Sequence, residues 1–147
     1  MKTLKLMLLW LIGGLILIQF IQIKLPPKPK ASKEDEIKAP KEVMAILKRS
    51  CYDCHSNEYK VPWYGYIAPI SWEVRSHING GLRALNFSIC YQYPKKNREK
   101  LLKDIVDSLW KMPPKDYLLI HKDAKISQKE EDLLRKWISD SIIANNY

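Results

Sequence analysis

The five-residue run Cys51-Tyr52-Asp53-Cys54-His55 constrains this chain more than any other feature. Two cysteines separated by two residues and followed at once by a histidine form a C-x-x-C-H motif, which is typical of covalent c-type haem attachment. Each thiol would form a thioether with one haem vinyl group, and the imidazole of His55 would bind the iron. Covalent tethering keeps a haem bound in a domain too small to enclose it fully. We therefore predict one haem c, held by Cys51, Cys54 and His55.

Three other uses of these cysteines are less consistent with the sequence. A redox dithiol of the thioredoxin type would follow a strand and precede a helix, whereas a predicted helix precedes this motif and a loop rich in proline and aromatic residues follows it. A zinc site formed by Cys51, Cys54, His55 and Cys90 would lack the usual second pair of ligands. A structural disulfide across two residues is uncommon. With both motif cysteines in thioethers, we expect Cys90 to be a buried, inert thiol, and an exposed or intermolecularly paired thiol is the alternative.

The sixth ligand of the iron has three candidates, and Met112 is the first. It lies in a Lys-Met-Pro-Pro loop between two predicted helices, from which a thioether could reach iron, although methionine more often fills a core gap. The second is His77, on the apolar face of a predicted helix, where a histidine is usually a core residue. The third is His121, in a loop where simple exposure is the alternative. The identity of the second axial ligand tunes the reduction potential of the haem iron.

The chain divides into three segments. Residues 1–23 contain an uncharged run of eighteen residues, Leu6 to Ile23, preceded by Lys2 and Lys5, and this length can just cross a bilayer. We predict an uncleaved transmembrane anchor, with a cleaved signal peptide as the alternative. Residues 24–39 form a Pro/Lys-rich linker that would hold the domain off the membrane, and residues 40–147 form the haem domain. Because bacteria attach haem c outside the cytoplasmic membrane, the domain is expected to face the periplasm from the inner membrane.

Helical periodicity dominates the haem domain, and no alternating run is long enough for a convincing strand. Ser127 and Glu130 match a capping box. The predicted helices span residues 40–49, residues 71–80 with an end at Gly80-Gly81, residues 98–110 capped by Asn97, and residues 127–145. The fold is therefore predicted to be all-α.

Basic residues outnumber acidic ones, 25 to 16, for a net charge of +9. They are scattered rather than interleaved with aromatic residues, which argues against nucleic-acid binding. The surplus is suited to anionic lipid headgroups or to an acidic redox protein partner.

Several short stretches together resemble the bacterial haem-binding domain family, whose members are small and usually membrane-anchored. They are Cys51 to Glu58, Pro62-Trp63-Tyr64, Ile67-Ala68-Pro69, Ser71-Trp72, Leu85 to Ser88 and Met112-Pro113-Pro114. The resemblance covers about residues 40–142 and implies a cytochrome-c-like helical fold, with Met112 in the matching Met-Pro-Pro loop. The chain departs from the family at Ile89-Cys90, where a tryptophan is often found.

Three functions follow from these patterns. The first is a membrane-tethered monohaem c-type cytochrome that carries electrons and is not an enzyme. The second is a peroxidase-like or ligand-sensing haem module with an open sixth position. The third is a thiol or zinc interaction module without haem.

Overall fold

The structure is a computed structural model and describes residues 2–145 and Tyr147. Within them it contains helices, turns and extended segments but no strand, which confirms the predicted all-α class. The elements are α1 (Lys2–Ile18), α2 (Lys41–Ser50), α3 (Tyr52–His55), η1 (Trp63–Tyr66), α4 (Ile70–Ala84), η2 (Phe87–Gln92), α5 (Lys95–Ser108), α6 (Lys115–Ile120), η3 (Lys122–Ala124) and α7 (Gln128–Ile143), where η marks a 3₁₀ helix.

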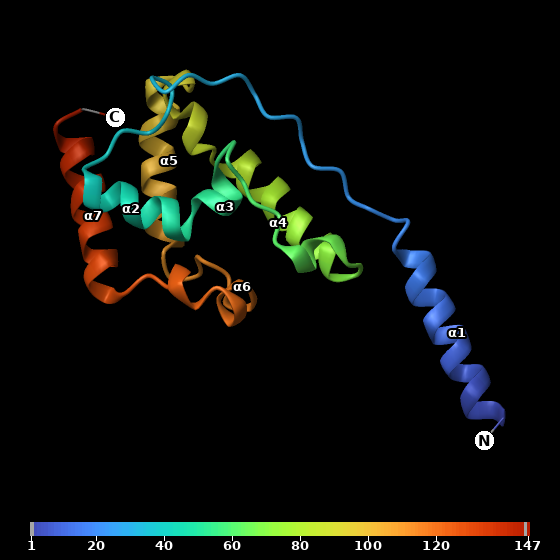
Figure 1. The fold of residues 1–147 in the computed structure, drawn as a ribbon. Coiled ribbons are helices and arrows are strands. Elements are labelled where there is room, and N and C mark those ends of the chain that lie inside the picture. The colour runs from blue at the N-terminus through green and yellow to red at the C-terminus, as the bar shows by residue number, and fades with distance from the viewer. Residues whose placement is uncertain (1, 146) are drawn as a thin grey trace.

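The hydrophobic core lies where α2, α5 and α7 meet (Figure 1). Leu47 of α2 and Leu134 of α7 are fully buried, and Leu102 of α5 is 3% exposed. Aromatic residues extend this core toward α3, because Tyr52 and Phe87 are buried and stack with ring centroids 5.4 Å apart. Tyr52 of α3 therefore packs into the same core as α2, α5 and α7, and this packing positions α3.

Two predicted helices begin within one residue of the predicted position. α2 begins after Pro40, and α7 begins after Ser127, whose hydroxyl accepts from the backbone N–H of Glu130 while the Glu130 side chain reaches back to Ser127. α5 starts at Lys95 and not after Asn97, because the carbonyl of Pro94 already accepts from the N–H groups of Asn97 and Arg98. The predicted cap at Asn97 is therefore wrong.

α4 does not end at Gly80-Gly81 as predicted, but continues through both glycines to Ala84. The structure gives Gly81 another role. A Cβ at this position would overlap the carbonyl oxygen of Cys54 and lie 3.1 Å from its carbonyl carbon. Glycine at 81 thus lets α4 approach the backbone of α3 closely, and a glycine that serves packing inside a helix has the same sequence signature as a stop signal.

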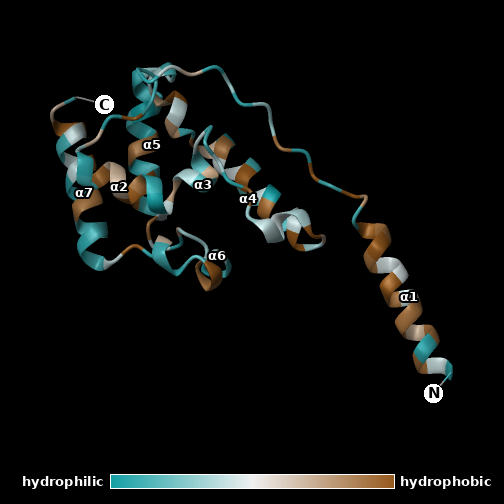
Figure 2. Ribbon diagram, viewed as in Figure 1, coloured by the Kyte–Doolittle hydropathy of each residue, from teal (hydrophilic) through white to brown (hydrophobic). Residues whose placement is uncertain are grey.

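The N-terminal helix α1 ends at Ile18, earlier than the predicted anchor, and Gln19 and Phe20 form a turn. In the part of the chain that the structure describes, no helix has both the length and the apolar character needed to span a membrane. Most of α1 is nevertheless hydrophobic, as the brown parts of its ribbon in Figure 2 show. Its large apolar side chains are exposed, and among them Trp10 is 80% exposed.

The segment that follows α1 is extended, as predicted for a proline-rich linker, but it is hydrogen-bonded to the domain. The side chain of Gln19 both donates to and accepts from the backbone of Ala68, at 3.1 and 2.8 Å. Further along, domain side chains donate to linker carbonyls in four pairs: Arg75 to Ile23, Asn79 to Lys24, Asn57 to Pro29 and Gln92 to Lys30. The linker therefore lies along the domain, and the hydrogen bonds that hold it there are accepted by its backbone carbonyls.

Candidate functional site

The C-x-x-C-H motif forms a single helical turn. Cys51 ends α2 and precedes α3, and its carbonyl accepts from the N–H groups of Cys54 and His55 at 3.1 and 3.0 Å. Residues three apart in a helix lie on the same face. Cys51 lies just before α3 and Cys54 lies within it, so we expect the two thiols on one side of this turn, of which His55 is the last residue.

The orientation of His55 is set by the end of α4. Its Nδ1 lies 3.1 Å from the carbonyl oxygen of Leu85, the residue after α4. A carbonyl can only accept, so Nδ1 carries the proton and donates it. Burial favours the neutral ring and lowers the pKa of His55, while the backbone carbonyls of Leu85 and Gly81 act in the opposite direction. In the neutral ring with Nδ1 protonated, Nε2 carries a lone pair. A histidine that donates from one ring nitrogen and keeps the other free is the usual arrangement of a metal ligand, and His55 therefore fits a haem iron.

The thiols do not resemble a redox pair. Burial raises the pKa of Cys51 to about 12 and that of Cys54 to about 11, whereas reactive dithiols have a lowered pKa. Cys90 is 5% exposed and packs in the core, as predicted. Within residues 2–145, the sets of three or more potential metal ligands that converge contain no cysteine, which argues against the zinc alternative.

The three candidates for the sixth position lie in different surroundings. Met112 is 39% exposed in the loop between α5 and α6. His77 places its Nε2 3.0 Å from a carboxylate oxygen of Glu73, and His121 places its Nε2 2.9 Å from the hydroxyl of Tyr64. Both histidines thus already use a ring nitrogen in a polar contact. Iron ligation by any of the three stays a prediction.

Sequence reasoning missed how α6 is attached to the site. Tyr117 of α6 donates its hydroxyl to the carboxylate of Asp53 at 2.8 Å, and Asp53 lies between the two motif cysteines. The Tyr117 ring stacks on His121 with centroids 4.2 Å apart. The hydrogen bond to Asp53 thus joins α6, which follows the Met112 loop, to α3, and the stacking on His121 orders the Tyr117 ring within its own segment. The sequence contained no signal for this link, because α6 itself was predicted to be a loop.

Several large apolar side chains of the domain are exposed. Trp63 of η1 is 73% exposed, Trp110 after α5 is 79% exposed, and Leu119 of α6 is 75% exposed. Among the other aromatic residues, Tyr64 is buried, and Trp72 donates its indole N–H to the backbone carbonyl of Ile21, in the extended segment that follows α1. A haem has two apolar faces that need such contacts, so the exposed residues also fit this cofactor.

Comparison with known proteins points the same way. A family model described as a haem-binding domain matches residues 13–140. The match begins within α1 and includes the extended segment that is hydrogen-bonded to α4. No curated protein and no solved structure gives a significant match.

Proposed function

Because this chain belongs to the haem-binding domain family, and is thus a haem-binding protein, we propose that it carries one haem c, bonded through Cys51 and Cys54 and ligated by His55. One observation carries the proposal: Cys51, Cys54 and His55 share one helical turn, in which the Nδ1 of the imidazole donates to the carbonyl of Leu85 at 3.1 Å. That hydrogen bond fixes the ring and directs its basic nitrogen away from the carbonyl, as ligation requires.

We further propose that the protein transfers single electrons and is not an enzyme. Bound haem supplies a one-electron iron couple. The chain would hold the axial imidazole still, through Leu85 and through Phe87, whose ring centroid lies 6.1 Å from that of His55. The contact between Tyr117 and Asp53 would steady the loop that carries Met112 as sixth ligand. The ligand side chains would then move little when the iron is reduced, as an electron carrier requires.

The proposed place of action is the periplasmic face of a bacterial inner membrane. The support is the exposed apolar surface of α1, which lipid would cover. The hydrogen bonds of Gln19 to Ala68 would keep the domain close to the membrane surface, in place of the separation that the linker composition alone predicts. The basic surplus of the chain favours an acidic redox protein as partner.

Covalent attachment is tested by producing the chain together with a c-type haem maturation apparatus. We expect the intact mass to increase by one haem, and the pyridine haemochrome spectrum to show both vinyl groups saturated. Replacing both Cys51 and Cys54 by alanine should abolish the added mass. Cys90→Ala is the matched control, because this cysteine lies in the core, and it should keep the haem. Wild-type chain without added mass would contradict the proposal.

Ligation by Met112 is tested by the absorption spectrum of the haem-loaded domain. We expect a low-spin spectrum with a methionine–iron charge-transfer band, and we expect Met112→Ala to lose both features because no thioether remains. His77→Gln and His121→Gln, each measured alone, serve as controls and should keep the band. If Met112→Ala keeps the wild-type spectrum while one histidine variant loses it, that histidine is the ligand.

A second function, a peroxidase-like or ligand-sensing module with an open sixth position, is favoured by one observation. Acid–base side chains lie on the elements near α3, in the pairs Tyr64–His121 and Glu73–His77. Such groups could move protons at a bound ligand. A high-spin spectrum of the wild-type domain that shifts with carbon monoxide would establish this function in place of electron transfer.

A further inference from the structure

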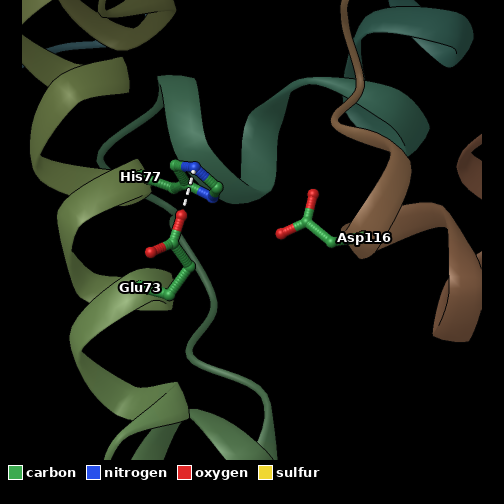
Figure 3. A group of neighbouring side chains, drawn as sticks. All are labelled: Glu73, His77 and Asp116. Atoms are coloured by element: carbon green, nitrogen blue, oxygen red, sulfur yellow. Dashed lines mark ion pairs between the residues drawn. The ribbon is translucent and has the colours of Figure 1, made fainter.

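A second group of potential metal ligands lies where α4 faces α6. Glu73 and His77 are one turn apart on α4, and Asp116 is in the first turn of α6 (Figure 3). The ligand atoms of the three side chains all lie within 4.8 Å of one another, and the Nε2 of His77 is 3.0 Å from Glu73. In Figure 3 the Asp116 carboxylate points from its own helix toward the other two residues.

The Glu73–His77 contact alone has a simple explanation, because residues four apart on a helix often form weak surface pairs. Asp116 does not fit that explanation. It adds a second carboxylate from a separate helix, and among residues 2–145 neither carboxylate forms an ion pair with a lysine or arginine. Two carboxylates this close repel each other. A cation between them would remove that repulsion.

The two helices hold the three side chains in this arrangement. Asp116 is followed directly by Tyr117, which is hydrogen-bonded to Asp53 and stacked on His121. On α4, Arg75 lies between Glu73 and His77 in the sequence and is hydrogen-bonded to the linker. Although the ligand atoms are solvent-accessible, both backbones are therefore fixed by contacts that have nothing to do with the cluster.

We propose that Glu73, His77 and Asp116 bind a divalent transition-metal ion, with Zn²⁺ as the best fit. One imidazole and two carboxylates with room for water form the three-ligand set of an open zinc site. With zinc–ligand bonds of about 2.0–2.2 Å, neighbouring ligand atoms of a tetrahedral site are roughly 3.3 Å apart. The cluster thus needs only a small contraction. The ion would bridge α4 and α6, and His77 would serve this ion and not the haem iron.

The test is a titration of the chain, as isolated with its haem, with Zn²⁺ in a calorimeter and with Mn²⁺ followed by electron paramagnetic resonance. Mn²⁺ is included because thiolates bind it poorly. The variants are Glu73→Gln, His77→Gln and Asp116→Asn, with Asp123→Asn as matched control because this exposed acid lies outside the cluster. We expect one Zn²⁺ per wild-type chain, and each cluster variant should lower the affinity at least about tenfold.

The control variant should bind Zn²⁺ as the wild type does, and Zn²⁺ should raise the melting temperature of the wild type but not of the cluster variants. Circular dichroism of each variant checks that it is folded. The proposal is overturned if the wild type takes up no Zn²⁺, or if the three variants bind it as well as the wild type, since the ion would then be held elsewhere. An imidazole that ligates the haem iron cannot also hold Zn²⁺, so wild-type chain in which His77 ligates the iron would take up no Zn²⁺ at this site, which also overturns the proposal.

Discussion

Replacing Gly81 by alanine is expected to destabilise the domain and to reduce haem attachment. The new methyl group would meet the Cys54 backbone, with the carbonyl carbon at 3.1 Å and Cβ at 3.2 Å. A backbone carbonyl cannot rotate away as a side chain can, so α4 and α3 would have to separate. Overpacking of this kind costs about 1–3 kcal/mol. The displaced residue is a predicted haem-bearing cysteine, so the yield of haem-loaded protein should fall as well.

The adjacent glycine provides the control. A Cβ at Gly80 would meet nothing within 4 Å, and alanine inside a helix is favoured over glycine by about 0.5–1 kcal/mol. Gly80→Ala should therefore stabilise the domain while Gly81→Ala destabilises it. Urea unfolding of the two variants measures the free energies, and absorbance measures the haem content. Equal effects of the two substitutions would show that α4 does not approach α3 as closely as described.

This pair of glycines also shows where sequence reasoning reaches its limit. Gly80-Gly81 was predicted to end a helix, because glycine is common after helix ends. The structure uses Gly81 for a contact with Cys54, a residue 27 positions earlier in the sequence. Local sequence contains no information on such a distant neighbour. The prediction of the helix type was confirmed, and that of its end was wrong for this reason.

The capping box is a feature that sequence predicted well, since it is local, whereas the haem-binding role of the motif stays a prediction. Ser127 and Glu130 form the expected capping box, and the C-x-x-C-H residues gather in one turn. α6 was missed because it has only six residues, Lys115–Ile120, too few to show a helical period. Without α6 the positions of Asp116 and Tyr117 could not be predicted.

The linker shows a second limit of prediction from sequence, which concerns hydrogen bonds made by the backbone. Its composition predicts an extended chain, and it is extended. Its hydrogen bonds to the domain use linker carbonyls, which every residue has, and donors such as Arg75 and Asn79 that are far away in sequence. Because backbone groups carry no sequence signature, composition alone cannot show whether such a segment is free or docked.

Phe87→Ala is expected to have the second large effect, on stability and on the haem spectrum together. Phe87 is 1% exposed, stacks on Tyr52 at 5.4 Å and lies 6.1 Å from the ring of His55. Removing a buried phenyl ring typically costs about 3–5 kcal/mol. The ring also links the core to His55, the predicted haem ligand. Without it His55 should become mobile, and the bands of the haem-loaded protein should broaden or shift toward high spin.

Leu134→Ala separates the two effects. Leu134 is fully buried in α7, which packs on α2 and α5, and its truncation should cost about 2–5 kcal/mol. Stability would fall to a similar extent, but the surroundings of His55 would be unchanged, so the spectrum of the folded protein should match the wild type. Both variants are compared by urea unfolding and by absorbance below the unfolding transition. If both leave the spectrum unaltered, Phe87 stabilises the core but does not position His55.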